Sequence, residues 1–405
     1  MWRCASGLAR NRWGIRRLSS VLRRHVVDEG DWSYSSEWWD PASEGHTCFS
    51  KLSSHGNGIV SVAAYPTSTP SVDQWLMTEK WLQHRYAAMY PELNQKDCQF
   101  KVLGYQWRVL KFNDDTRQST VKVMAACRPS DPGSLILMQQ SHCLAVPYVK
   151  SMVSVGLTAL AASSFDLLNA VIGKKSMNIL CIGHGGGTIP LFLASKIKGS
   201  NVHVVEIDPV VVEASVEAMG FPSFDQTQQF IWDETLKSRI SIHVSDVYDY
   251  IKKDSNIYDI VFVDAYDGDD IFPCKLWDIN GDFLPHLANR VHPVHGTVVV
   301  NLHSDSDVPT RGDGDDNSLF FQSLLPLGKY VRKVCSAYKG HFGEAFTVAV
   351  PWLCNITLVA CKGKIFDRRD IVSGQLASKS NLVEALLNLK FSCLNYVKSG
   401  LMVVK

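Results

Sequence analysis

The stretch that decides the fold is Asn178-Ile-Leu-Cys-Ile-Gly-His-Gly-Gly-Gly-Thr-Ile-Pro-Leu-Phe-Leu-Ala194. A short apolar strand runs into a glycine cluster and a helix, and the next strand, Val202-His-Val-Val-Glu206, ends in an acid. Glycines let backbone approach a ligand closely, and the new helix directs its free N–H groups at that ligand. Glu206, about twenty residues beyond the glycines, is placed to accept hydrogen bonds from ribose hydroxyls. This order predicts a nucleoside pocket.

Strands and helices alternate after Lys175, with short connections. Such alternation implies parallel strands joined by right-handed crossovers. The last two apolar runs have no clear helix between them, so we expect them to form a closing antiparallel hairpin. The fold class predicted is α/β, with a doubly wound, mostly parallel seven-stranded sheet. The expected strands are Asn178–Ile182, Val202–Glu206, Ile240–Val244, Tyr258–Asp264, Gly296–Leu302, Tyr330–Ala337 and Asn355–Ala360.

A different pattern precedes this region. Residues 28–71 show little periodicity, and 75–90 have apolar positions at helical spacing. Three short strand patterns follow, separated by turn residues, and predict a small antiparallel β-sheet. A single long helix is expected over 147–172. The predicted domains are therefore residues 1–27, an N-terminal region at 28–146, and a nucleoside-binding domain at 147–405.

The first 27 residues are arginine-rich and contain serine, and no acid occurs before Asp28. This composition is typical of an organelle transit peptide. The segment Arg17-Leu-Ser-Ser20 resembles a mitochondrial processing site. We expect residues 1–27 to be a transit peptide and the protein to act in the mitochondrion, with plastid and cytoplasm as alternatives. The other interpretation is a basic arm that binds an anionic partner.

Composition excludes several function classes. The formal net charge is +1, so no overall field favours nucleic acid or anionic lipid. The 11 cysteines are scattered without a C-x-x-C pair, which indicates free thiols rather than a disulfide framework or metal site. The most apolar stretch, Ser151–Phe165, is shorter than the roughly 20 residues that a membrane-spanning helix needs. We expect no metal, no membrane span and no nucleic-acid partner.

Three acids end successive strands. Glu206 ends the second strand, Asp246 follows the third, and Asp264 ends the very apolar fourth strand. Ligands of open α/β sheets bind outside the carboxyl ends of the strands, so the three acids are expected to converge. Each acid alone has a plainer interpretation, as a turn residue or a helix N-cap, and the N-cap applies especially to Asp246. Together with the glycines they favour S-adenosylmethionine over a dinucleotide, whose third glycine position is here Thr188.

These motifs resemble those of class I S-adenosylmethionine-dependent methyltransferases, and within them the spermidine-synthase-like branch with its Rossmann-like fold. The likeness is strongest over 174–302 and extends over about 100–362. It implies that the glycine loop lines the methionine and ribose parts of the cofactor, Glu206 holds the ribose, and Asp246 holds the adenine amine. By the same likeness Ile207 and Val247 flank the adenine, and Asp264 is expected among the cofactor-binding residues as well as the catalytic ones. The loop glycines are Gly183, Gly185, Gly186 and Gly187.

Two departures from that branch separate methyl transfer from aminopropyl transfer. Spermidine synthases carry an Asp directly after the third glycine, to hold the amine end of decarboxylated S-adenosylmethionine; here the residue is Thr188. The change removes repulsion against the carboxylate of intact S-adenosylmethionine. The synthase motif Asp-Ser-Ser-Asp-Pro appears as Asp264-Ala-Tyr-Asp-Gly268, with both acids retained. The sequence thus favours an amine methyltransferase; aminopropyl transfer is the alternative.

The expected catalytic residues are Asp264 and Asp267, which would orient an amine, and Tyr266, whose ring face favours a cation. The acceptor would be a protein amine or a polyamine-like cation, and the small sheet could pair two protomers in a homodimer. His303 is either a proton acceptor or a surface histidine, and His184 is expected to fill the glycine turn. A non-catalytic organelle assembly factor with the same fold is the competing class.

Overall fold

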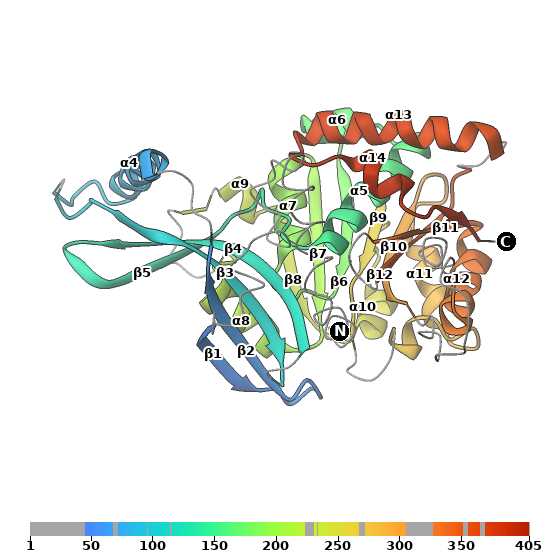
Figure 1. Cartoon of the computed structure of the whole chain (residues 1–405), viewed down its shortest axis with the longest axis horizontal. Helices are drawn as coiled ribbons and strands as arrows, with labels where there is room; N and C mark the ends of the chain where they lie inside the picture. Colours follow the sequence, from blue (N-terminus) through green and yellow to red (C-terminus); the bar gives the residue numbers. More distant parts are fainter. Residues whose placement is uncertain are drawn as a thin grey trace, which may run out of the picture. The chain divides into compact units, whose positions relative to one another are not determined.

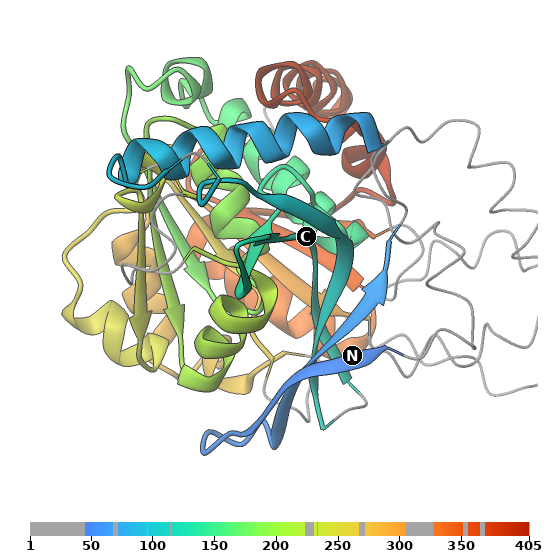
Figure 2. The same cartoon turned by 90° about the vertical axis from the view of Figure 1, so that its left-hand side faces the viewer.

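The structure is a computed structural model. It describes residues 45–67, 72–94, 96–113, 116–222, 231–232, 234–266, 272–304, 327–350, 355–364 and 369–404. The predicted transit peptide at 1–27 lies outside these residues. The chain divides into two compact units, one of residues 1–146 with 184–245, the other of residues 147–183 with 246–405. Figures 1 and 2 show the ribbon from two directions.

The first unit contains the small antiparallel sheet that the sequence predicts, but the sheet is larger than expected. Its five strands pair in chain order, each antiparallel to the next. Helix α4 (Val72–Met89) lies between the second and third strands in the chain, close to its predicted position. The strands are β1 (His46–Leu52), β2 (Ile59–Pro66), β3 (Lys101–Phe112), β4 (Thr116–Arg128) and β5 (Asp131–Gln139).

The β1–β2 hairpin lies in a region that we expected to lack regular structure. The two strands run side by side in both views (Figures 1 and 2). All residues of β1 except Phe49 are exposed, so the strand lacks the alternation of apolar and polar residues that reveals a half-buried strand. Its partner β2 is largely buried and carries the apolar contacts of the hairpin.

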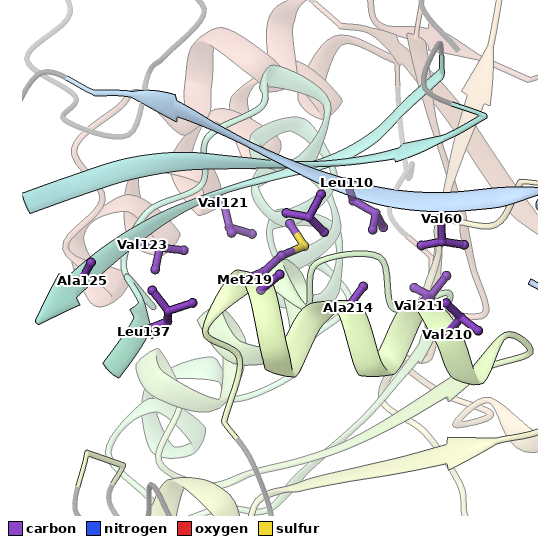
Figure 3. Packing of buried hydrophobic residues seen from close by; sticks show 12 residues of the cluster. Val60, Leu110, Val121, Val123, Ala125, Leu137, Val210, Val211, Ala214 and Met219 are labelled. Carbon is purple, nitrogen blue, oxygen red and sulfur yellow. The ribbon is translucent and has the colours of Figure 1, made fainter. Parts of the chain in front are cut away.

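The core of the first unit forms where this sheet packs on helix α8 (Pro209–Met219). Figure 3 shows side chains of β2, β3, β4 and β5 facing those of α8. The valines of the strands and the small Ala214 and Ala218 of α8 bring helix and sheet close together. Buried apolar area of this kind is the main source of stability for such a layer. The cluster comprises Val60, Val62, Leu110, Val121, Val123, Ala125, Leu137, Val210, Val211, Ala214, Ala218 and Met219.

The first unit also contains part of the α/β region. Helix α7 (Thr188–Lys196) leads into β7 (Ser200–Glu206), and α8 and α9 (Glu234–Lys237) lead into β8 (Ile240–Val244). β7 and β8 are parallel, with Val202 opposite Ile240 and Glu206 opposite Val244. The parallel arrangement and the strand ends agree with the sequence prediction within two residues.

The sheet of the second unit runs in the order β13–β11–β12–β10–β9–β6. β6 (Met177–Ile182), β9 (Ile260–Val263) and β10 (Thr297–His303) are parallel, and β12 (Asn355–Cys361), β11 (Glu344–Ala349) and β13 (Met402–Val403) are antiparallel to their neighbours. The buried helix α5 (Pro147–Ala162) packs on β9, β10 and β12. The remaining helical segments are α6 (Leu167–Val171), α10 (Val247–Lys253), η3 (Cys274–Leu276), α11 (Phe283–Arg290), α12 (Lys329–Phe342), α13 (Arg369–Leu387) and α14 (Cys393–Lys398).

The predicted seven-stranded arrangement is wrong in its last part. Residues 330–337, expected as a strand, belong to helix α12. Val331, Val334 and Tyr338 are buried at intervals of three and four residues, which is helical spacing. The antiparallel hairpin exists, but it is formed by β11 and β12, and β13 adds a further strand beyond β11.

The single helix expected over 147–172 is also wrong. It is divided into α5 and α6, because Ser164 adopts a left-handed φ of 67° and Asp166 caps the start of α6. Among the described residues, no helix combines the length and the apolar character needed to cross a bilayer.

The core cluster gives a direct test of the first unit. Leu110 of β3 is 0% exposed and Leu52 of β1 is 74% exposed. We expect Leu110→Ala to lower the free energy of unfolding by about 2–5 kcal/mol, through lost transfer energy and a cavity. Leu52→Ala, the matched control, should change it by no more than about 0.5 kcal/mol. Chemical denaturation of both variants measures the difference, and equal effects would contradict the packing described.

Candidate functional site

The predicted site residues belong to both units. The first unit carries Gly185, Gly186, Gly187, Glu206 and Ile207, and the second carries Gly183, Asp246, Val247, Asp264 and Tyr266. Asp267, expected to be catalytic, lies outside the described residues, as do Asp269 and Asp270.

The loop between β6 and α7 requires glycine at both of its ends. Gly183 has a φ of 90°, and a Cβ there would lie 2.2 Å from the carbonyl oxygen of Asp264. Gly187, the N-cap residue of α7, has a φ of 73°, and a Cβ there would lie 2.2 Å from the ring of Phe221. Any side chain at either position would combine backbone strain with a clash. The loop is therefore a tight, fixed turn around the start of α7.

Two polar atoms beside this turn are buried and have no hydrogen-bond partner among the described residues. They are Oγ1 of Thr188 and Nδ1 of His184. Helix α7 also lacks a side-chain hydrogen bond at its N-cap. Buried polar groups are normally paired, and helix N-termini attract anions. The Thr188 hydroxyl and the uncapped start of α7 can thus donate to a polar, anionic ligand. The neutral His184 ring donates from Nε2 to Ser215, whose own hydroxyl donates to the carbonyl oxygen of Val212, so its Nδ1 can only accept.

Glu206 lies at the end of β7 and is 8% exposed. Its Oε2 accepts the backbone N–H of His184 at 2.8 Å, and its Oε1 accepts the N–H of Asp208 at 3.0 Å. Burial raises the pKa of Glu206, and these N–H groups oppose the shift. The backbone N–H of Ile207 is a third donor to this carboxylate. Because a carboxylate can accept about four hydrogen bonds, Glu206 retains capacity for about one hydroxyl donor. Ile207, the next residue, is 46% exposed and presents an apolar side chain.

His184 fills space in the turn. Its Nε2 lies 2.7 Å from Oγ of Ser215, and its ring meets the Phe221 ring edge-on at 4.8 Å. Burial lowers the pKa of His184 to about 3, so the ring is neutral at physiological pH.

Asp246 is the N-cap residue of α10, which is the plainer of the two roles expected from the sequence. Its Oδ1 accepts the backbone N–H of Tyr248 at 2.8 Å, and Val247 is the first residue of α10. The roles of Asp246 and Val247 toward an adenine remain predictions.

Asp264 sits directly after β9 in a polar network within the second unit. Nδ2 of Asn301 donates to its Oδ1 at 2.9 Å, and the hydroxyl of Tyr148 donates to the same carboxyl group. Asn355 in turn donates to Oδ1 of Asn301 at 3.0 Å, which fixes the orientation of the Asn301 amide. Burial raises the pKa of Asp264, and the two donors counteract part of the rise.

Sequence reasoning placed Asp264 at this edge of the sheet but missed Tyr148 and Asn355. Tyr148 is on α5 and Asn355 begins β12, far from Asp264 along the chain, and neither belongs to a local motif. Burial, with Asp264 beside it, raises the pKa of Tyr148 well above its usual value, so its hydroxyl stays protonated and can only donate to the carboxylate.

Two further predicted residues lie near strand ends of the second unit. His303 is the last residue of β10 and is partly buried rather than a surface loop histidine, and burial lowers its pKa to about 4. Tyr266, two residues beyond Asp264, is partly buried, and its predicted role remains untested. Among the described residues, no cluster of three or more His, Cys, Asp or Glu side chains has the arrangement of a metal site, and the described cysteines are free.

Comparison with known proteins places the chain near two kinds of transferase. It is 29% identical over 179 residues to the eEF1A lysine and N-terminal methyltransferase of Mus musculus, which covers 38% of the chain and 24% of that protein. It is 31% identical over 166 residues to the polyamine aminopropyltransferase of Vibrio vulnificus, which covers 38% of the chain and 47% of that protein. The chain thus spans less than half the length of either relative. No family model matches.

Among solved structures, the chain is similar to human methyltransferase-like protein 13 in complex with SAH, with a TM-score of 0.44 and 20% identity, over 60% of the chain and 93% of that structure. The curated matches confirm the resemblance to class I methyltransferases with spermidine-synthase-like relatives.

The pKa shift of Asp264 predicts a pH-dependent stability. Because its folded-state pKa is raised, the folded state holds this proton more tightly than the unfolded chain does. The resulting stability is present at acid pH and is lost as the pH rises through the raised pKa. We expect Asp264→Asn, which cannot ionise, to have a higher Tm than the unsubstituted protein at about pH 8 and to lose this advantage toward about pH 4.

Asp166 is the matched control because its shift has the opposite sign. The N–H of Asn169 lowers the pKa of this exposed N-cap. Its contribution is therefore present at neutral pH and is lost as the pH falls. Asp166→Asn should lower Tm near neutrality, and the difference should fade in acid. Thermal unfolding across the pH range measures both, and parallel trends would contradict the assignment.

Proposed function

We propose that the chain is an S-adenosylmethionine-dependent methyltransferase that acts on an amine. The observation that carries the proposal is Thr188. This residue occupies the position after the third glycine, it opens helix α7, and its buried hydroxyl has no partner among the described residues. A neutral donor there suits a carboxylate, which intact S-adenosylmethionine has and its decarboxylated form lacks.

The start of α7 supports the same reading. Helices α8 and α10 also follow strands, and each is capped by an aspartate, Asp208 or Asp246. Helix α7 is preceded by Gly187 and has no side-chain cap. Its N-terminal partial positive charge is therefore available to the amino-acid carboxylate of the cofactor. Within the first unit, Glu206 would accept a ribose hydroxyl with its remaining capacity and Ile207 would contact the adenine. Within the second unit, Asp246 and Val247 keep the adenine roles that the resemblance implies.

Asp264 would act on the methyl acceptor by taking up a proton from its amine. S-adenosylmethionine, when bound, would supply a sulfonium methyl group: an amine lone pair would bond to the methyl carbon as the carbon–sulfur bond breaks, and S-adenosylhomocysteine would leave. The amine must give up a proton, and a raised pKa makes Asp264 a stronger base than an ordinary carboxylate. Tyr148 and Asn301 hold its carboxyl group in one orientation, while Tyr266 and Asp267 would line the approach of a cation.

The acceptor class follows from this chemistry and from the named activity of a relative. The mouse protein is named for lysine and N-terminal methylation, and we propose a protein amine for this chain as well. Aminopropyl transfer, the named activity of the Vibrio protein, is the second candidate, favoured by the retained acids of the Asp264 motif. Mitochondrial import through residues 1–27 and homodimer formation are separate proposals that do not depend on the site.

Thr188→Asp tests the choice of cofactor. We expect the unsubstituted protein to bind S-adenosylmethionine in preference to decarboxylated S-adenosylmethionine in calorimetric titration. An acid at position 188 would repel the carboxylate of the intact cofactor, so the variant should bind it about tenfold more weakly or worse, about 1.4 kcal/mol. Its affinity for the decarboxylated form should rise.

Thr188→Ser retains the hydroxyl and is the control, with both affinities near those of the unsubstituted protein. Glu206→Ala should weaken the binding of both ligands. A preference of the unsubstituted protein for the decarboxylated form would instead support aminopropyl transfer, and binding of neither ligand would exclude both enzymatic proposals.

Asp264→Asn tests the chemical role. The near-isosteric amide keeps partners for Asn301 and Tyr148 but cannot accept the amine proton. We expect transfer of labelled methyl groups to extract proteins to fall by about 10²-fold or more, with the Kd for S-adenosylmethionine unchanged. Cofactor binding without a methylated product from the unsubstituted protein would favour the non-catalytic assembly factor.

A further inference from the structure

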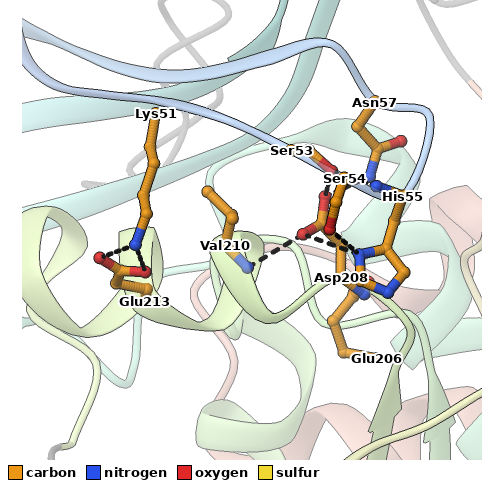
Figure 4. A network of polar contacts seen from close by, with 9 residues as sticks. All are labelled: Lys51, Ser53, Ser54, His55, Asn57, Glu206, Asp208, Val210 and Glu213. Atoms are coloured by element: carbon orange, nitrogen blue, oxygen red, sulfur yellow. Dashed lines mark hydrogen bonds and ion pairs between the residues drawn. The ribbon is translucent and has the colours of Figure 1, made fainter.

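Asp208 is a fully buried carboxylate in the first unit, 0% exposed, at the N-cap of α8. Figure 4 shows the turn of the β1–β2 hairpin above it. Ser53 Oγ donates to Asp208 Oδ2 at 2.6 Å, and Asn57 Nδ2 donates to the same oxygen at 2.7 Å. The other oxygen, Oδ1, accepts the backbone N–H of Val210 at 2.9 Å, and Nδ1 of His55 lies 4.0 Å from it.

A buried carboxylate is costly unless donors replace its lost water. The side-chain donors Ser53 and Asn57 come from a hairpin that lies about 150 residues earlier in the chain than Asp208. The Ser53 hydroxyl is itself oriented, because its oxygen accepts the N–H of His55 at 2.9 Å and its proton is directed at Asp208. The turn is thus built around this carboxylate.

The backbone N–H of Asp208 also donates to Glu206, the residue proposed to hold the ribose. This N–H lies 3.0 Å from Oε1 of Glu206, and Oε2 of Glu206 accepts from the glycine loop through His184. The hairpin therefore reaches Glu206 through one intervening residue. A shift of Asp208 would move the N–H that holds one of the two carboxylate oxygens.

We propose that Ser53 and Asn57 are positioning residues for ribose recognition, and that they act through Asp208 on Glu206. The inference rests on the proposed function, since it assigns Glu206 to a nucleoside ligand. It makes the β1–β2 hairpin part of the ligand-binding apparatus, although neither Ser53 nor Asn57 contacts the ligand. Ribose hydroxyls, rather than the base or the amino-acid end, are the groups whose recognition depends on the hairpin.

The same hairpin supplies a control. Lys51 pairs with Glu213 of α8 at 2.6 Å, a contact between the same two elements that does not involve Asp208. The Lys51 side chain is 51% exposed, so the pair contributes little to stability. Lys51→Ala therefore removes a hairpin–helix contact without disturbing the path to Glu206 (Figure 4).

The test is calorimetric titration of the full chain with two probes, S-adenosylhomocysteine and its analogue lacking the ribose 2′-hydroxyl. We expect the unsubstituted protein and Lys51→Ala to prefer the hydroxyl-bearing probe by about tenfold or more, the equivalent of one well-placed hydrogen bond to a charged group. In Ser53→Ala/Asn57→Ala the preference should fall to less than about threefold, because Glu206 is no longer held for that hydroxyl. The single variant Ser53→Thr, which keeps a hydroxyl at this position and leaves Asn57 intact, should retain the preference.

A general loss of folding would weaken the binding of both probes together and leave the ratio of their affinities unchanged. A change in this ratio therefore reports the positioning of Glu206 and not the stability of the fold. If the double variant does not fold, Asn57→Ala alone, which leaves Ser53 on Asp208, should still reduce the preference. A preference unchanged in the folded variants would overturn the inference while the proposed function stands. Failure of the unsubstituted protein to bind either probe would overturn the proposed function itself.

Discussion

The carboxylate of Glu206 is the constraint on which the first unit depends. It is almost fully buried, and its two oxygens are occupied by backbone N–H groups, one from the glycine loop and one from the start of α8. A backbone donor cannot be moved by choosing another rotamer, so the carboxylate and the two segments hold each other in place. Burial raises its pKa, yet the N–H groups favour the charged form, and a charged acceptor is what ribose hydroxyls require.

Asp264 is also a buried carboxyl group that needs hydrogen-bond donors, and side chains supply them instead of the backbone. Its partners are the side chains of Tyr148 and Asn301, and Asn355 orients the amide of Asn301. Side-chain donors can rotate away more readily than backbone groups. The backbone thus fixes the partners of Glu206, whereas the side-chain partners of Asp264 can rearrange. That difference fits a division between holding a cofactor and handling the proton of an acceptor.

The parts of this molecule that sequence reasoning predicted are those with local chemistry. The glycine loop, Glu206 and the parallel strands follow from residue order and apolar runs alone. The β1–β2 hairpin was missed because β1 is nearly all exposed and gives no alternation. Residues 330–337 were misread as a strand because five apolar residues in so short a window do not distinguish a strand from a helix; the helical spacing becomes clear only when Tyr338 and Phe342 are included. Tyr148 and Asn355 were missed because their importance comes only from tertiary contact with Asp264 and Asn301.

The helix N-termini argue further for a carboxylate ligand. Where a strand leads into α8 or α10, the chain supplies its own anion, and the carboxylate of Asp208 or Asp246 satisfies an N–H group of the first turn. At α7 it supplies Gly187 and then Thr188, neither of which carries a charge. An aspartate at position 188 would place a negative charge where the partial positive charge of the helix lies, and would compete with any anionic ligand for it. With threonine, that charge and one hydroxyl are left to the ligand. A ligand with a carboxylate gains both interactions, whereas one that ends in an ammonium gains neither and meets the wrong sign of potential. The proposed preference for intact S-adenosylmethionine thus rests on the absence of an acid at this helix start as much as on the Thr188 hydroxyl.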